Sequence, residues 1–256
     1  MSEGKLHGLS LRALAPNAVT AAALCMGLSG FWFAMQELWP AALAAVAIAA
    51  FLDGLDGRIA RMVNGQSRFG AELDSLSDVI SFGVTPALIA FMWTLQDMPR
   101  FGWTIALFFV LCQALRLARF NAQIDTEEQP HKSAGFNTGV PAPAGAGMAL
   151  LPLLFWVEFG FDVARDYWLV GPWMLFVALL MVSNVATFSW TSLRIRPAYR
   201  FPALAVVGLY IALLIAEPWI GLVVFISGYT LAIPFSMMSY ARAKRRRRAK
   251  ETAPSA

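Results

Sequence analysis

Long apolar stretches recur along the whole chain, and each is long enough to cross a lipid bilayer, which takes about 20 residues. Of the 256 residues, 58% are hydrophobic and only 14% are charged, whereas a soluble domain carries roughly 25% charged residues. A soluble helical bundle would need a polar face on each helix, and most of these stretches have none. The sequence therefore predicts an all-α fold, a polytopic bundle of membrane-spanning helices.

Turn signals divide the apolar sequence into about eight predicted transmembrane helices. Proline follows Trp39, Met98 and Glu217, where a helix is expected to end or begin. The predicted helices lie near residues 17–36, 39–60, 71–95, 101–119, 139–157, 168–188, 202–216 and 218–240. They form one membrane domain, residues 1–240, which is followed by a basic tail, residues 241–256.

The placement of basic residues predicts the orientation. With a cytoplasmic N-terminus, all of the 20 Lys and Arg except Arg100 and Arg165 fall in cytoplasmic segments, as the positive-inside rule requires. Both termini are then cytoplasmic. The tail sequence ARAKRRRRAK, residues 241–250, has two interpretations, a nucleic-acid-binding segment or an anchor on anionic lipid headgroups. Because it directly follows a membrane helix, we favour the anchor and expect no nucleic-acid partner.

Four aspartates interrupt this apolar sequence within residues 53–78. Asp53 and Asp56 are three residues apart near the end of the second predicted helix, and Asp74 and Asp78 are four apart near the start of the third. Both spacings place the pair on one helical face. Since the chain turns around between the two pairs, the four carboxylates are expected to converge near the cytoplasmic face.

The negative charge of these four acids needs a positive partner, because a charge within a membrane span is costly. Such charges are commonly functional. Divalent metal bound by hard oxygen ligands is the simplest compensation, and Mg²⁺ or Mn²⁺ suits carboxylates together with substrate phosphates. Two ions about 4 Å apart would suit a phosphoryl displacement. Two alternatives stay open: Asp–Arg pairs that tie the helices together, and a cation or proton pathway. The pathway is disfavoured because the acids gather at one surface.

Glycines and arginines next to the acids support a substrate site. Gly57 and Gly70 lie beside the acids in predicted helices, where glycine is unfavourable unless backbone or substrate approaches closely. Arg61 and Arg68 are suited to holding a diphosphate.

The acids also form a longer pattern, which is Asp53-x2-Asp56-Gly57-x2-Ala60-Arg61-x8-Gly70-x3-Asp74-x3-Asp78. This pattern resembles the CDP-alcohol phosphatidyltransferases. The resemblance implies that a CDP-linked lipid gives its phosphatidyl group to an alcohol and releases CMP. It implies that Asp53, Asp56 and Asp74 bind metal, and that Asp78 is the general base with possible metal contact. It also implies a homodimer and direct displacement, with a covalent intermediate on Asp78 as the alternative.

Three further segments narrow the resemblance: SRFGAELDSLSDVISFGVTPA (67–87), ALRLARFN (114–121) and GVPAPAGAG (139–147). They are similar to integral-membrane phosphatidylserine synthases, although Val140 replaces the leucine usual there. The resemblance implies CDP-diacylglycerol and L-serine as substrates. The residues expected to bind the CDP-lipid are Gly57, Ala60, Arg61, Gly70, Arg68, Asn17 and Thr20.

A serine acceptor needs a cation for its carboxylate. Arg116 and Arg119 lie three residues apart at the cytoplasmic end of the fourth predicted helix, and Asn121 follows; these three are the predicted serine ligands. The alternative is that both arginines only anchor the topology.

Other functions stay open for the whole chain. They are the same chemistry with glycerol 3-phosphate, inositol phosphate or choline, a catalytically silent lipid-binding relative, and a cation transporter. The expected location is a bacterial inner membrane.

Overall fold

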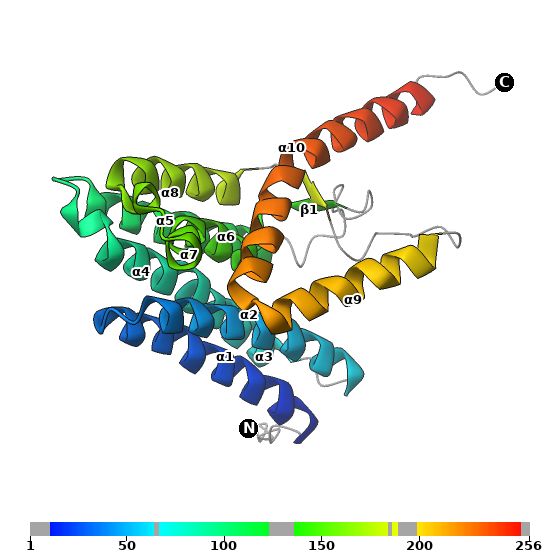
Figure 1. Cartoon of the computed structure of the whole chain (residues 1–256). Helices are drawn as coiled ribbons and strands as arrows, with labels where there is room; N and C mark the ends of the chain where they lie inside the picture. The colour runs from blue at the N-terminus through cyan, green and yellow to red at the C-terminus, as the bar shows by residue number, and fades with distance from the viewer. Residues whose placement is uncertain (1–10, 64–66, 123–135, 184–185, 189–198, 252–256) are drawn as a thin grey trace.

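The computed structural model describes residues 11–63, 67–122, 136–183, 186–188 and 199–251. In this part of the chain the protein is a bundle of helices, as predicted (Figure 1). In chain order the elements are α1 (Leu11–Met35), α2 (Trp39–Met62), α3 (Arg68–Val79), the π-helix η1 (Ile80–Val84), α4 (Thr85–Trp93), the 3-10 helix η2 (Leu95–Asp97), α5 (Gly102–Ala122), β1 (Phe136–Thr138), α6 (Ala142–Ala149), α7 (Leu151–Phe159), the 3-10 helix η4 (Asp162–Arg165), α8 (Tyr167–Val182), β2 (Ala186–Phe188), α9 (Arg200–Ala216) and α10 (Pro218–Glu251).

Five helical segments of the described chain are long and apolar enough to cross a membrane, and they become six when α6 and α7 count as one bent span. The five are Leu14–Met35, Trp39–Met62, Arg68–Trp93, Gly102–Ala122 and Pro218–Ser239. The predicted segments at 168–188 and 202–216 correspond to α8 and α9, which are apolar but shorter. Length and composition thus support five or six spans, fewer than the predicted number of about eight.

The predicted helix at 71–95 contains a π-helical turn between α3 and α4. In η1 the consecutive residues Ser81, Phe82 and Gly83 are all buried, because α1 packs on one side and α5 on the other. The approach of α1 is close, since a Cβ atom on Gly27 would lie 2.6 Å from Ser81 Cβ. A π-helical turn often occurs at a functional site, and this one directly follows the helix that carries Asp78.

The predicted helix at 139–157 starts later and is broken. It begins at Ala142, and its two halves α6 and α7 are bent by 48°. The small residues of α6 allow close packing within the chain: a Cβ on Gly145 would lie 2.7 Å from Met181 Sδ in α8, and one on Gly147 would lie 3.1 Å from Ile226 Cδ1 in α10. This segment therefore packs inside the chain.

The predicted helix at 168–188 is wrong at its C-terminal end. Helix α8 ends at Val182, because Ser183 adopts an extended conformation with φ −64° and ψ 159°. Strand β2 follows and pairs antiparallel with β1, so that Asn137 lies opposite Thr187. The all-α prediction missed this ladder, since strands of three residues are too short to produce a recognisable alternation.

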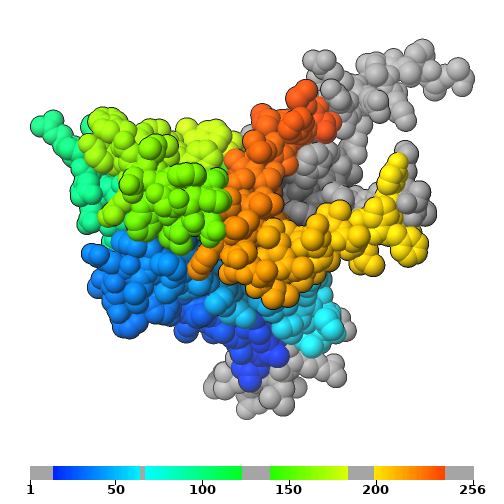
Figure 2. Space-filling model, viewed as in Figure 1, coloured from blue at the N-terminus to red at the C-terminus, as the bar shows by residue number. Residues whose placement is uncertain are grey.

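The last two helices differ in how they pack against the bundle (Figures 1 and 2). Helix α10 packs on α6, α7 and β2, whereas α9 projects outward and packs on α10. None of the residues of α9 is buried, and Phe201 is 84% exposed. In a bilayer, such an apolar surface faces lipid tails. Helix α10 continues past the predicted limit of residue 240 to Glu251.

Candidate active site

Three carboxylates from two helices meet at one end of the bundle. One oxygen from each of Asp53, Asp56 and Asp74 lies within 4.8 Å of the other two. Asp53 and Asp56 come from the C-terminal half of α2, and Asp74 comes from α3. The fourth acid, Asp78, is one turn further along α3 and lies beside Asp53. The predicted convergence of the four aspartates is therefore present.

A cleft of about 270 Å³ opens beside these acids, between α1, α2 and the start of α3. Of the residues predicted to bind the CDP-lipid, all except Arg68 line it. The lining consists of Pro16, Asn17, Thr20, Asp56, Gly57, Ala60, Arg61, Ser67, Gly70, Ala71 and Asp74. Arg68 is exposed and lies outside this lining.

Two hydrogen bonds hold the walls of this cleft. The Thr20 hydroxyl of α1 lies 2.6 Å from Asp56 Oδ2 and donates to it, and Asp56 is only 5% exposed. Ser67 caps α3, because its side chain accepts a hydrogen bond from the Gly70 N–H at 3.0 Å. A Cβ on Gly70 would lie 2.8 Å from Asn17 Oδ1. The cleft thus depends on a glycine at position 70 and on contacts that α1 makes with both acid-bearing helices.

Asp78 and Arg116 form a second polar group next to the three carboxylates. Arg116, from α5, interacts electrostatically with Asp78 and Asp53, and also with Tyr229 of α10. Asp78 Oδ1 and Arg116 Nε and Nη1 are buried, and these atoms have no hydrogen-bond partner among the described residues. Buried polar atoms are normally hydrogen-bonded to protein, water or ligand. This arrangement suits a small guest that donates a proton to Asp78 and places an anion at Arg116.

The other two predicted serine ligands have partners within the protein. Arg119 Nη1 donates to Val182 O at 2.9 Å and Nη2 donates to Ser183 O at 3.3 Å, so this side chain caps the C-terminal end of α8. Asn121 Nδ2 donates to Ser75 Oγ at 3.0 Å. Of the three predicted residues, the structure brings only Arg116 beside Asp78.

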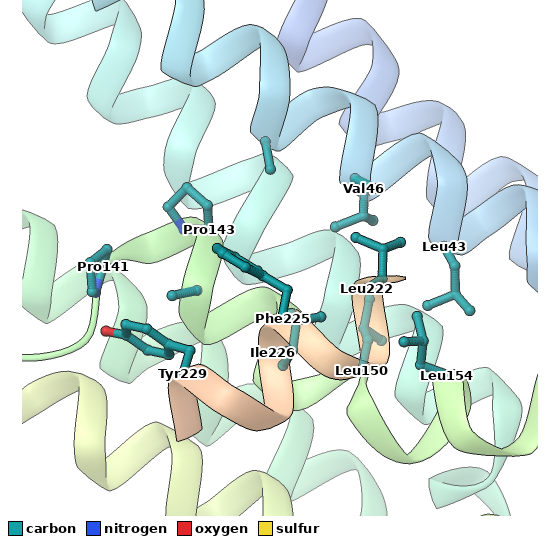
Figure 3. Close-up of a pocket in the computed structure, with 14 residues that line it drawn as sticks. Leu43, Val46, Pro141, Pro143, Leu150, Leu154, Leu222, Phe225, Ile226 and Tyr229 are labelled. Carbon is teal, nitrogen blue, oxygen red and sulfur yellow. The ribbon is translucent and has the colours of Figure 1, made fainter. Parts of the chain in front are cut away.

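An apolar pocket of about 360 Å³ lies between α2, α6, α7 and α10 (Figure 3). Its wall on α2 consists of Leu43, Val46, Ala47 and Ala50. Continuing that helical face by one turn leads to Asp53, because residues three and four apart share a face. Tyr229, which interacts with Arg116, lies at the end of the pocket near Pro141 and Pro143 (Figure 3). The pocket therefore extends along α2 from the neighbourhood of the acids.

The carboxylate group fits a divalent metal. Its donors are three hard oxygen ligands from a rigid pair of helices, the kind of set that Mg²⁺ and Mn²⁺ prefer. Asp53, Asp56 and Asp74 would hold the ion, and the cleft beside them leaves room for substrate oxygens.

Several residues of the site escaped prediction. Ser67 could have been predicted from the sequence, because serine is a common N-cap residue and Ser67 directly precedes the first residue of α3. Gln113 was also detectable as an amide within an apolar span; it is fully buried in α5, one turn before Arg116. Tyr229 carries no such signal, because only the folding of α10 against α6 brings it near Arg116.

Comparisons with known proteins show the family to which the chain belongs. The model of a family described as CDP-alcohol phosphatidyltransferase matches residues 13–188, and that of CDP-alcohol phosphatidyltransferase 2 matches residues 198–234. A Mycobacterium bovis protein named CDP-diacylglycerol–serine O-phosphatidyltransferase is 38% identical over 233 residues, which cover 91% of this chain and 81% of that protein. A Helicobacter pylori protein of the same name is 32% identical over 218 residues, covering 85% and 88%. A Saccharomyces cerevisiae protein of that name is 48% identical over 101 residues, covering 38% and 36%.

Proposed function

Since the chain belongs to the CDP-alcohol phosphatidyltransferase family, as its aspartate pattern predicted, we propose that it transfers the phosphatidyl group of CDP-diacylglycerol to L-serine. The products are phosphatidylserine and CMP. The observation that carries the proposal is the meeting of Asp78 and Arg116 beside the three-carboxylate group. One place then provides a base for a hydroxyl and a cation for the acceptor's carboxylate, next to a site for a diphosphate. The relatives named above support serine as the alcohol.

The reaction is a displacement at the phosphorus atom that carries diacylglycerol. The serine hydroxyl oxygen forms a bond to this phosphorus, and the bond from phosphorus to the bridging diphosphate oxygen breaks, so that CMP leaves with that oxygen. Asp78 accepts the hydroxyl proton, as a base within hydrogen-bond reach can. Arg116 binds the serine carboxylate and thereby holds the hydroxyl towards Asp78. Bound Mg²⁺ or Mn²⁺ would offset the charge of the diphosphate and of the leaving CMP.

The lipid substrate is divided between the two cavities. The cytidine and diphosphate occupy the cleft lined by Gly57, Ala60 and Gly70, with Arg61 beside the phosphates. An acyl chain runs along α2 from the acids into the apolar pocket of Figure 3. This division agrees with the chemistry of the two linings, since the cleft contains charged and polar side chains and the pocket contains mainly aliphatic and aromatic ones.

The protein sits in a bacterial inner membrane with both termini and the aspartates on the cytoplasmic side, and it acts as a homodimer. The two basic residues that the charge rule places outside come from the same end of the bundle, since the Thr94 hydroxyl in the segment before Arg100 donates to Arg165 O. That end is opposite to the aspartates along α4 and α5, which supports the orientation.

The proposed function is tested by CMP release from purified protein in detergent with CDP-diacylglycerol and Mg²⁺ or Mn²⁺. L-Serine, glycerol 3-phosphate, inositol phosphate and choline are added singly. We expect release with L-serine alone, and loss of that release in EDTA. Release with another alcohol would agree with the proposed metal and CDP-lipid site but would contradict serine as the acceptor. No release with any of the four from folded protein would favour the silent relative or the transporter.

Replacing Gly57 by valine is expected to raise the KM for CDP-diacylglycerol about 10-fold, equivalent to about 1.4 kcal/mol of lost binding. A Cβ on Gly57 meets no atom within 4 Å, so the fold accommodates the side chain, which then occupies space in the cleft. Steady-state kinetics at saturating serine measure this KM.

Gly54→Val is the matched control for this prediction. Gly54 lies one turn earlier on the same helix, its Cβ would also meet nothing within 4 Å, and it does not line the cleft. Its KM should stay at the wild-type value. Equal KM values for the two variants would contradict the placement of the nucleotide.

A further inference from the structure

The amide of Gln113 is buried in α5 without a hydrogen-bond partner among the described residues. The side chain has 0% exposure, and both its Oε1 and Nε2 atoms are unpaired there. Leaving a buried polar group unsatisfied is costly, whereas an apolar side chain of the same shape would avoid that cost. A polar side chain at such a position is explained when water or a ligand pairs with it.

Gln113 is one of several polar side chains of α5 that lie against the antiparallel segment α3–η1. Among them, Asn121 pairs with Ser75. Deeper in the bundle Arg116 lies beside Asp78, and the next contact is between Gln113 and η1, where a Cβ on Gly83 would lie 2.9 Å from Gln113 Cγ. Gln113 and Arg116 are three residues apart and therefore share a face of α5. The Gln113 side chain thus lies one turn before Arg116 on α5 and packs against the segment α3–η1, which also carries Asp78.

We propose that Gln113 binds the ammonium group of the acceptor and so completes its recognition. L-Serine carries a hydroxyl, a carboxylate and an ammonium on adjacent carbons. Asp78 takes the hydroxyl proton, Arg116 binds the carboxylate, and Gln113 Oε1 accepts a hydrogen bond from the ammonium. The inference rests on the proposed serine transfer and assigns a third contact to the same site. The three contacts are made to the ammonium, the carboxylate and the hydroxymethyl group on the Cα of serine. Together they select serine over a hydroxy acid that lacks the ammonium.

The test compares L-serine with 3-hydroxypropionate, which keeps the hydroxyl and carboxylate but lacks the ammonium. In the wild type, kcat/KM should be at least about 10-fold higher for L-serine, the size that a hydrogen bond to a charged group supports. Gln113→Met keeps the length of the side chain and removes the amide. We expect its KM for L-serine to rise about 10-fold or more and its preference over 3-hydroxypropionate to disappear. Its KM for CDP-diacylglycerol should be unchanged.

Stability distinguishes recognition from a structural role. Because Gln113→Met removes two unpaired polar atoms, its Tm should equal or exceed that of the wild type. Thr85→Val is the control. It likewise removes a buried polar group, here a hydroxyl, that has no partner among the described residues, but Thr85 packs beside Gly30 of α1 and not beside Arg116. This control should keep the wild-type KM for serine. Gln113→Leu provides a second apolar replacement if the methionine variant fails to fold.

Two results would overturn the inference. A wild-type KM for L-serine in Gln113→Met or Gln113→Leu would show that the amide only binds water. A lower Tm with reduced kcat and unchanged KM would show a packing role. Failure of the proposed function is separate, because the wild-type protein itself would then release no CMP with L-serine.

Discussion

Asp78→Asn should lower kcat for serine-dependent CMP release by roughly 10²–10⁴-fold, the usual contribution of a general base. Asparagine keeps the shape of the side chain but cannot accept the hydroxyl proton. Asp78 is the acid that has both a buried oxygen without a partner among the described residues and the Arg116 guanidinium beside it. The three other acids remain to hold metal and the CDP-lipid, so the KM for CDP-diacylglycerol should change little.

Glu72→Gln is the matched control for this result. Glu72 lies on the same helix but is exposed and outside the lining of the cleft. The same carboxylate-to-amide change should leave kcat at the wild-type value. If Asp78→Asn retains wild-type kcat, Asp78 is not the base, and a burst of one CMP per protein without serine would favour a covalent intermediate on an acid.

Asp74→Asn should weaken Mn²⁺ binding by at least about 10–100-fold, which is the loss caused by altering residues that only support metal ligands. One oxygen of Asp74 lies within 4.8 Å of oxygens from Asp53 and Asp56, and these two come from one helix while Asp74 comes from another. Asp74→Asn therefore removes the charged ligand that α3 contributes to the group. Titration of purified protein with Mn²⁺, followed by electron paramagnetic resonance, measures the Kd directly without any turnover.

The same titration separates metal binding from catalysis. Glu72→Gln should bind Mn²⁺ like the wild type, and Asp78→Asn should retain most of the affinity if its main role is proton transfer. Activity of Asp74→Asn should fall together with its metal occupancy and recover in part at high Mn²⁺. An unchanged Kd in Asp74→Asn would place the ion elsewhere, and the alternative of Asp–Arg pairs joining the helices would then be favoured.

Much of the candidate site was predictable from spacing along the chain. Asp53 with Asp56, and Asp74 with Asp78, each share one helical face at the reported spacing, and both helices are present. Ser67 and Gly70 also follow from local rules, since capping involves only neighbouring residues. These features depend on the period of a helix, which is set within a few residues of sequence.

Other features of the structure depend on partners that are distant along the chain. Arg119, which was predicted to bind serine, donates to the carbonyl groups at the end of α8. The helix predicted to reach residue 188 ends at Val182 and gives way to the β1–β2 ladder. In each case the competing partner lies more than forty residues away along the chain, and no local pattern carries that information.

The sequence by itself determined that this chain is a helical membrane protein of the CDP-alcohol phosphatidyltransferase family, because apolar length and the spacing of four aspartates are properties of short segments. The tertiary structure alone decided which residues lie next to the aspartates. The π-helical turn after α3 fits between Gly27 and Gln113, Arg116 lies beside Asp78, and Tyr229 of α10 interacts with Arg116. Close packing selects these neighbours, since a buried side chain is constrained by every helix that touches it.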